Sequence, residues 1–260
     1  VQYNEYMELV PRGGAGSGFV IDNKGHIVTN FHVIKGAQKI FVALGTQENS
    51  YPAKLVGYDE RNDIAVLRVQ APASLLKPVR MGDSSRLQVG QTAVAVGNPF
   101  GLGQTITTGV VSSLNRDIKT SKQETMMGLI QTDASINRGN SGGPLFDSSG
   151  RVIGVNTLIY SPSGGSVGIG FSIPINRVKR FVPDLLKYGK VRYPWMGILV
   201  KSVTPRLASI LKLPVKQGLM VMQTLKGGAA YTAGIRGGTR RVYIGNYPII
   251  LGGDIILAVD

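Results

Sequence analysis

The sequence predicts a mainly β fold built from antiparallel barrels or sandwiches, and three observations lead to this expectation. Up to about residue 173, short apolar segments of strand length recur at spacings of mostly 10 to 20 residues, with Gly, Pro, Asn and Asp in the gaps. No two of them are joined by a long helical pattern, which argues against a wound α/β sheet. The chain also has 35 glycines among 260 residues, roughly twice the average share, which favours a turn-rich architecture.

The strand candidates begin with a hairpin. Residues 19–21 and 27–29 flank a turn segment, 22–25, that ends in Gly25. Further strand candidates lie at residues 39–44, 64–69, 92–96, 107–112, 128–132, 152–158 and 167–173.

The first helix candidate begins near Asn176. Val178, Val182 and Leu185 follow helical spacing, and Pro183 is expected to break or kink the helix.

A smaller second domain is expected after a linker at residues 188–194. Apolar segments follow at 197–200, 218–221 and 254–257, and the chain stops directly after the last of them. We therefore predict a first domain at residues 1–190 and a second, incomplete domain at residues 191–260.

Composition excludes several kinds of site. The absence of cysteine excludes disulfides, thiolate metal sites and a cysteine nucleophile. No stretch approaches the roughly 18 apolar residues of a membrane helix. No signal-peptide pattern is present, and because the chain does not begin with Met, a targeting segment is expected to have preceded it. P-loop, HExxH and paired-carboxylate motifs are absent, and the glycines at 14, 16 and 18 form too short a motif for a dinucleotide site.

The net charge is +14. Residues 191–260 carry nine Lys or Arg against two Asp, a net of +7, and residues 1–190 carry 20 basic against 13 acidic residues, also +7. A basic surface attracts nucleic acid, anionic lipid or acidic protein, so a binder of anionic surfaces stays open as an alternative function. No Lys/Arg run or aromatic-spaced basic motif supports a specific nucleic-acid partner.

The strongest chemical signal lies at residues 138–145, where Ser141 stands among Gly139, Gly142 and Gly143. A serine hydroxyl attacks only when a base removes its proton. Backbone N–H groups beside it must also face the oxygen that becomes negative in the tetrahedral intermediate. The glycines permit the tight turn and close substrate approach that this requires. An ordinary Gly-rich turn between strands is the alternative interpretation.

The order of the partner residues selects one kind of triad. The elbow of α/β-hydrolases needs a His after the Ser, but the two histidines, His26 and His32, both precede Ser141. A subtilisin order needs an Asp before the His; Asp22 is the sole candidate and the wound sheet is absent. The order His, Asp, Ser remains.

We therefore predict a catalytic triad of His32, Asp63 and Ser141. His32 directly follows a strand candidate, whereas His26 lies at the hairpin turn and is expected to be solvent-exposed. Asp63 immediately precedes an apolar strand, where a half-buried carboxylate needs a partner, and the imidazole N–H of His32 would be that partner. Asp59 is the competing candidate, further from that strand.

Several long motifs resemble the HtrA/Deg proteases, at residues 27–33, 62–67, 95–101, 132–145 and 168–174. The resemblance covers most of residues 16–190. It implies a trypsin-like serine protease domain at residues 1–190, with a chymotrypsin-like double six-stranded β-barrel. It also implies a partial PDZ-like α+β domain at residues 191–260 without its C-terminal helix and strand. Unfolded or damaged proteins as substrates, no cofactor, a trimer-based homo-oligomer and an extracytoplasmic compartment such as the periplasm follow from the same resemblance.

The resemblance also assigns binding residues. The oxyanion hole would comprise Gly139, Asn140 and Ser141. The substrate pocket would be lined by Ile136, Leu158 and Ile159; none is acidic, so a Lys or Arg side chain there would lack a partner, and small or medium aliphatic residues are expected before the cut. The loop that binds a peptide carboxylate in the PDZ-like domain would be Trp195, Met196, Gly197 and Ile198.

Three features qualify the resemblance. Asn140 stands where digestive relatives have an Asp that pairs with a new N-terminus, so activation by N-terminal processing is not expected; loops at residues 115–128, 135–140 and 159–168 would order the oxyanion hole instead. Arg138 stands where the family usually has Pro, which suggests acidic or phosphate-bearing substrates. An insertion at residues 237–252 interrupts the second domain.

The competing interpretation is a chaperone or peptide-binding scaffold on a protease fold, with cleavage weak or switched off. If cleavage does occur, activity is expected to fall below about pH 6.5, where an imidazole base takes up a proton.

Overall fold

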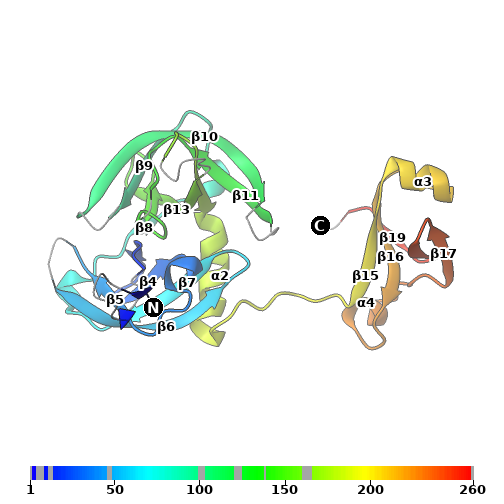
Figure 1. Cartoon of the computed structure of the whole chain (residues 1–260), viewed down its shortest axis with the longest axis horizontal. Coiled ribbons are helices and arrows are strands. Elements are labelled where there is room, and N and C mark those ends of the chain that lie inside the picture. The colour runs from blue at the N-terminus through cyan, green and yellow to red at the C-terminus, as the bar shows by residue number, and fades with distance from the viewer. Residues whose placement is uncertain are drawn as a thin grey trace. The chain divides into compact units, whose positions relative to one another are not determined.

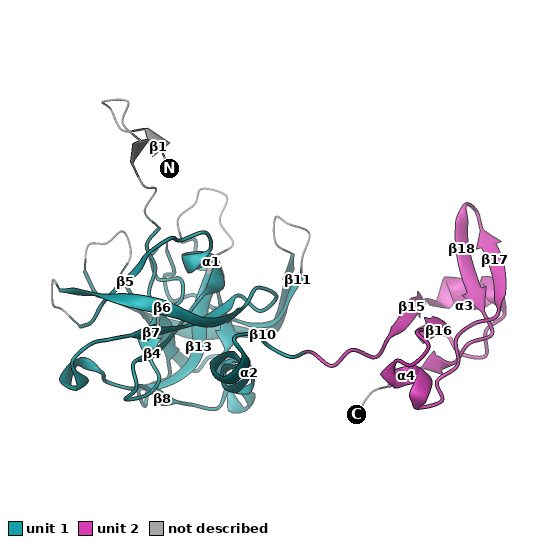
Figure 2. Cartoon of the chain, turned by 90° about the horizontal axis from the view of Figure 1, so that it is seen from below, with its two compact units in different colours: residues 1–192 teal, residues 193–260 magenta. Residues whose placement is uncertain are grey.

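The computed structural model describes residues 14–45, 49–98, 103–119, 125–137, 139–159 and 166–258, together with the backbone of strands β1 (Gln2–Tyr3) and β2 (Leu9–Val10). For Leu158 and Ile159 it describes the backbone alone. The chain forms two compact units, Val1–Arg192 and Tyr193–Asp260, which Figure 2 colours separately.

Besides the short antiparallel pair β1–β2, unit 1 contains two larger sheets (Figure 1). The first has the strand order β3-β4-β7-β6-β5, with β3 at Phe19–Val20, β4 at His26–Thr29, β5 at Ile40–Ala43, β6 at Ser50–Asp59 and β7 at Ile64–Val69. The second has the order β12-β9-β10-β11-β14-β13-β8, with β8 at Arg80–Met81, β9 at Thr92–Gly97, β10 at Thr105–Lys119, β11 at Thr125–Thr132, β12 at Pro144–Phe146, β13 at Arg151–Ile159 and β14 at Gly170–Pro174. Because β12 pairs with both β9 and β13, six of these strands close into a barrel, and β8 joins β13 in parallel. Short 3₁₀ turns lie at Ala73–Leu75 and Ser84–Arg86.

The apolar pattern decides how each strand is used. β7 lies between β4 and β6, and every residue of it except Arg68 is buried, as a near-continuous apolar run predicts. β9 alternates, so that Ala93 and Ala95 are fully buried while their neighbours are not; this period of two places one face of the strand in the barrel interior.

Three apolar clusters hold unit 1 together. One lies within the first sheet and includes Ile34, Leu67 and Val69. Another lies within the second barrel. The third combines residues of both sheets with helix α2 (Ile175–Tyr188): Phe19, Val28, Ile64, Leu129, Val155, Ile173, Val178 and Leu185 are among its buried members. The two sheets therefore share a core, and neither can move far without exposing it.

Helix α2 runs on through Pro183 and ends at Tyr188. The prediction that a helix starts near Asn176 is confirmed. Of the predicted break or kink at Pro183, the break is wrong, and the kink stays a prediction. A helix-interior proline costs about 3 kcal/mol, whereas each fully buried Val or Leu contributes about 1.5–3 kcal/mol, and Val178, Val182 and Leu185 are all buried. Packing outweighs the proline. Gly189 (φ 72°) ends the helix, its N–H bound to the carbonyl of Leu185 at 3.0 Å.

The predicted strands of unit 1 are present to within a few residues, but strand β6 is not among the sequence predictions. Pro52 and Gly57 interrupt the sequence of this strand, and many of its residues are exposed. The strand therefore shows no clear alternation of apolar and polar residues. The two larger sheets also differ in their number of strands. The second barrel closes with the expected six strands, whereas the first sheet has five strands within the described residues. The predicted mainly β architecture is confirmed.

Unit 2 is a small α+β unit. Its three-stranded sheet has the order β15-β16-β19, with β15 at Ile198–Val203, β16 at Gly218–Thr224 and β19 at Ile255–Ile256. Helices α3 (Pro205–Leu211) and α4 (Ala229–Thr232) connect these strands. The predicted insertion forms a hairpin of β17 (Arg240–Ile244) and β18 (Tyr247–Leu251). Its residues Ile249 and Leu251 join Val203 and Met220 in the core. In the described part of the whole chain, no helix has the length and hydropathy needed to cross a membrane.

Candidate active site

His32 lies in a single helical turn, α1 (Phe31–Ile34), directly after β4. Asn30 precedes the turn with extended backbone, and its side-chain amide donates to the backbone carbonyl of Asp63 at 2.9 Å. Ile34 is buried in the core of the first sheet. Because these contacts fix the turn, the His32 side chain is held in place although it is 48% exposed.

Asp63 directly precedes β7 and has a left-handed backbone, with φ 53°. Asp tolerates this conformation better than most residues with a side chain. Its carboxylate accepts the backbone N–H of His32 on Oδ1 at 2.8 Å, and its Oδ2 lies 2.7 Å from His32 Nδ1. Because a carboxylate can only accept, the contact requires a proton on Nδ1. A neutral His32 then carries its lone pair on Nε2.

Thr157 contacts both Asp63 and Ser141. The sequence analysis does not predict it as a site residue. Its Oγ1 donates to Asp63 Oδ2 at 2.6 Å, and its carbonyl accepts from the hydroxyl of Ser141 at 3.3 Å. A signal for it exists in the sequence. Asn156 and Thr157 are polar residues in an otherwise apolar strand, both are almost fully buried, and buried polar groups need partners.

Ser141 lies between β11 and β12. Its carbonyl accepts the backbone N–H of Ser17 at 2.8 Å. In the described residues its hydroxyl donates to Thr157, and no hydrogen bond joins it to His32. Thr157 thus brings Ser141 next to the Asp63–His32 pair, with the hydroxyl turned toward β13.

The segment before Ser141 forms a turn, here called the oxyanion turn (residues 137–141). Asn140 N–H donates to the carbonyl of Asn137 at 3.0 Å, and Gly139 has φ 104°. A positive φ at the third residue of a hydrogen-bonded turn favours Gly or Asn there. Asn140 is 1% exposed; its amide nitrogen donates to the carbonyl of Ser135 at 3.2 Å, and its Oδ1 has no partner in the described residues.

The predicted substrate pocket is only partly within view. Ile136 is 1% exposed and packs in the core of the second barrel. The side chains of Leu158 and Ile159 lie outside the described residues, so the pocket stays a prediction. Outside the described residues also lie Arg138 and, in the loops expected to order the oxyanion hole, residues 120–124 and 160–165.

His26 is not solvent-exposed, contrary to the sequence prediction. It begins β4, its side chain is 14% exposed, and its Nδ1 lies 2.6 Å from Asp22 Oδ2. Burial raises the pKa of Asp22, but hydrogen bonds from the side chain and backbone of His26 outweigh it, so the pKa lies below its ordinary value. The competing carboxylate, Asp59, is buried and accepts from Asn62 Nδ2 at 2.6 Å. His26 and Asp59 are therefore each hydrogen-bonded within a local turn.

Other carboxylates of unit 1 also serve local turns. Hydrogen bonds from the side chains of Ser85 and Asn176 lower the pKa of Asp83 to about 2. Burial raises the pKa of Asp147, and hydrogen bonds from Arg151 outweigh it. Within the described ranges, no three His, Asp or Glu side chains converge in a metal-binding arrangement.

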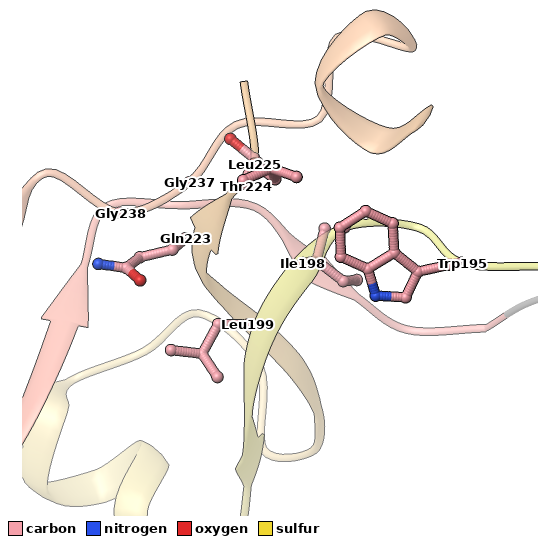
Figure 3. Close-up of a pocket in the computed structure, with 9 residues that line it drawn as sticks. Trp195, Ile198, Leu199, Gln223, Thr224, Leu225, Gly237 and Gly238 are labelled. Atoms are coloured by element: carbon pink, nitrogen blue, oxygen red, sulfur yellow. The ribbon is translucent and has the colours of Figure 1, made fainter. Parts of the chain in front are cut away.

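Unit 2 has an open pocket of about 470 Å³ at the start of β15 and the end of β16 (Figure 3). Three of the four residues predicted for a carboxylate-binding loop, Trp195, Gly197 and Ile198, line it; Met196 does not. In the described part of the chain, the N–H groups of Met196 and Gly197 donate no hydrogen bond, whereas the carbonyl of Gly197 accepts from Leu225 N–H at 2.7 Å. The other lining residues are Leu199, Gln223, Thr224, Leu225, Gly237 and Gly238.

Comparison with known proteins matches a family model described as "Trypsin-like peptidase domain" at residues 16–155. Protease Do-like 1, chloroplastic, of Arabidopsis thaliana is 48% identical over 252 residues, which cover 96% of this chain and 55% of that protein. The periplasmic serine endoprotease DegP of Escherichia coli is 43% identical over 249 residues, which cover 95% of this chain and 50% of that protein. The chain therefore spans about half the length of these curated relatives.

Among solved structures, an HtrA-type protease AlgW with a decapeptide superimposes with a TM-score of 0.75 at 39% sequence identity. The match covers 85% of this chain and 67% of that one.

Proposed function

Because the chain belongs to the trypsin-like peptidase family, and within it to the HtrA/Deg proteases, we propose that it is a serine endopeptidase with His32, Asp63 and Ser141 as its triad. The observation that carries the proposal is the double contact of Asp63 with His32, at 2.8 Å to the backbone N–H and 2.7 Å to Nδ1. Asp22 makes the same double contact with His26, but the His26 side chain is only 14% exposed. The His32 side chain is 48% exposed, and Thr157 links Asp63 to the hydroxyl of Ser141, so the contact with Asp63 orients a ring that substrate can reach.

The mechanism follows from this orientation. Nε2 of His32 accepts the Ser141 proton as the hydroxyl attacks the scissile carbonyl, and the imidazolium then protonates the leaving amine. Asp63 stabilises the imidazolium while accepting from Thr157. The Ser141 hydroxyl reaches His32 by rotating about its Cα–Cβ bond away from the Thr157 carbonyl; such contacts often tighten only in the substrate complex. The N–H groups of Gly139 and Ser141 are the donors proposed for the negative oxygen. The N–H of Asn140, the third residue predicted for the oxyanion hole, instead donates to the carbonyl of Asn137 at 3.0 Å.

The proposed substrates are unfolded or damaged proteins, cut after small or medium aliphatic residues. The preference is carried over from the family resemblance; Ile136 is apolar, but it is 1% exposed and packs in the core of the second barrel. A peptide library with each residue type before the cut tests it. Cleavage mainly after Lys or Arg would contradict the proposed pocket of Ile136, Leu158 and Ile159.

Unit 2 is proposed to be a partial PDZ-like domain that binds a peptide C-terminus. The N–H groups of Met196 and Gly197, which donate no bond within the described residues, are suited to a carboxylate, and Trp195 and Ile198 offer apolar surface beside them. A peptide with a free C-terminus and its amidated counterpart separate this from unspecific apolar binding, since only the former should bind.

We also propose a trimer-based homo-oligomer and an extracytoplasmic location. The name of DegP, which is called periplasmic, supports this location, whereas the Arabidopsis relative is called chloroplastic. Sedimentation of the purified chain tests the oligomer; a monomer at all concentrations would contradict it for this chain.

The experiment that tests the activity uses a fluorophosphonate probe, which reacts with activated serines. The labelled peptide should map to Ser141, and Ser141→Ala should abolish both the labelling and the digestion of casein. Labelling elsewhere would overturn the triad. Protection of unfolded casein from aggregation without cleavage would favour the scaffold interpretation.

A further inference from the structure

The segment at residues 14–18 lies against the oxyanion turn, although the proposed mechanism gives it no role. Four hydrogen bonds converge on Ser17. Its N–H donates to the carbonyl of Ser141 at 2.8 Å, and its hydroxyl donates to the carbonyl of Gly139 at 2.6 Å. Its hydroxyl also accepts the N–H of Asn98 at 3.0 Å, and its carbonyl accepts the hydroxyl of Thr29 at 2.7 Å.

The direction of the Ser17 hydroxyl is determined by these partners. A hydroxyl has one proton to donate, and a carbonyl can only accept. Since the N–H of Asn98 already points at Oγ, the proton of Ser17 points at Gly139. One residue of the first sheet's N-terminal segment therefore holds the carbonyls of both Gly139 and Ser141, two of the residues whose N–H groups are proposed to bind the oxyanion.

The bond to the Gly139 carbonyl acts on the peptide between Gly139 and Asn140. Gly139 has φ 104°, and because glycine reaches positive and negative φ about equally readily, its own sterics do not fix this conformation. The N–H of the same peptide, that of Asn140, donates to the carbonyl of Asn137 at 3.0 Å. Ser17 and Asn137 therefore hold this peptide from its two ends, and an external contact selects the conformation of Gly139.

Close packing reinforces the contact. A Cβ added at Gly142 would collide with the carbonyl of Ser17 and the hydroxyl of Thr29, and one added at Gly143 would lie 3.1 Å from the Ser17 Cβ. Thr29 is 3% exposed, so it offers Ser17 a rigid support in β4. The segment cannot shift away from the turn without breaking these contacts together.

We propose that Ser17 is a positioning residue that fixes the peptide between Gly139 and Asn140, and so holds the Gly139 and Ser141 N–H groups toward the reacting carbonyl. The inference rests on the proposed peptidase activity. It assigns to the first sheet a part in building the oxyanion hole, besides carrying His32 and Asp63.

The test compares Ser17→Ala with Thr132→Ala. Thr132 is a matched control because its hydroxyl also donates to a carbonyl, that of Val110 at 2.8 Å, and accepts an N–H, that of Ala134 at 3.1 Å. Removing one oxyanion donor costs roughly 100- to 1000-fold in kcat. Ser17→Ala loosens a donor without removing it, so we expect kcat to fall about 10- to 100-fold with KM changed less than about threefold.

Two further measurements separate positioning from a general loss of structure. A peptide boronate, which forms a tetrahedral adduct with Ser141, should lose affinity by the same factor as kcat/KM. Uncleaved peptide should bind Ser141→Ala with and without Ser17→Ala equally well. Thr132→Ala should lower the unfolding temperature but leave both the boronate affinity and kcat/KM near those of the parent. A rise in KM alone, or equal boronate losses in both variants, would overturn the proposal.

Hydrogen exchange keeps this test independent of the proposed activity. In Ser17→Ala, the N–H of Asn140, which closes the turn, should exchange at least about tenfold faster, and in Thr132→Ala it should not. If the parent protein neither reacts with fluorophosphonate nor cleaves casein, the peptidase proposal fails, and exchange still decides whether Ser17 holds the turn. Unchanged exchange at residues 139–143 would refute that role.

Discussion

Replacing Asn140 by Asp tests whether the oxyanion turn relies on a neutral side chain. The two side chains have nearly the same shape, so the change is mainly one of charge. Asn140 is 1% exposed and its amide nitrogen faces the carbonyl of Ser135 at 3.2 Å. In Asn140→Asp an ionised oxygen would face that carbonyl, and the other oxygen would keep the position of Oδ1, which has no partner in the described residues. A protonated carboxyl, by contrast, could donate to Ser135.

The size of the effect follows from burial. Fully buried carboxyls have pKa values raised by up to 3–5 units. A rise of two to three units above about 3.9 corresponds to about 3–4 kcal/mol of lost stability at pH 7. In a domain of this size, that lowers the unfolding temperature by about 6–16 °C. Because the folded pKa would be raised, the variant matches the parent below about pH 4, and the loss grows as the pH rises to about 6–7 and then levels off.

Thermal unfolding of the two proteins between pH 4 and pH 8 measures this difference. Asn115→Asp is the control, since Asn115 is exposed and its φ of 55° suits Asp as well as Asn. The control should show little difference from the parent at any pH. A difference for Asn140→Asp that is flat across this range, or absent at pH 8, would refute the reasoning that burial without a partner forces an amide at this position.

Three further changes test other contacts of unit 1. Thr157→Val removes the hydroxyl that donates to Asp63. Because a hydrogen bond to a charged group contributes about 1.5–3 kcal/mol, kcat/KM should fall about tenfold or more, whereas Thr157→Ser should stay near the parent. An equal kcat/KM for both variants would speak against the contact. Asp83→Asn should be less stable than the parent above about pH 4. Because the pKa of Asp83 is lowered to about 2, the difference in unfolding temperature between the variant and the parent should shrink as the pH falls from 4 toward 2. A constant difference would be the contrary result. Gly142→Ala should lower the free energy of unfolding by several kcal/mol more than Gly150→Ala. Both glycines have positive φ, but only at Gly142 would a Cβ collide with neighbouring atoms. Equal unfolding temperatures of the two variants would count against the close contact with Ser17.

The fold class could be predicted because its signals are local. β7 is a continuous apolar run and β9 alternates with a period of two, and each pattern depends only on residues adjacent in the chain. Pro183 shows the limit of such signals. Its local cost is real, but the burial of Val178 and Leu185 against two sheets decides the outcome, and that contact is made by residues far apart in sequence.

Some residues of the candidate site could likewise be predicted from the sequence, and others could not. His32 and Asp63 could be proposed from the order of residue types and from a carboxylate placed before an apolar strand. Thr157 and Ser17 could not, because serine and threonine are common in strands and turns and their roles depend on which carbonyl or carboxylate the fold brings near. The buried Asn156–Thr157 pair was the one available clue. His26 was misjudged because a hairpin turn predicts exposure, whereas its contact with Asp22 covers it.

Both sheets of unit 1 take part in the proposed site, and this has a consequence for how activity is lost. The first sheet carries His32 and Asp63, and the second barrel carries Ser141 and Thr157. Their shared core with α2 means that the sheets cannot separate without exposing fully buried residues such as Ile64, so separation amounts to global unfolding. The oxyanion turn itself is largely buried, but residues 14–18, which hold it, are exposed except for the half-buried Ser17, and an exposed segment is the kind of element that opens locally. Heating should therefore abolish activity below the unfolding temperature of the barrels, through the turn and not through the triad.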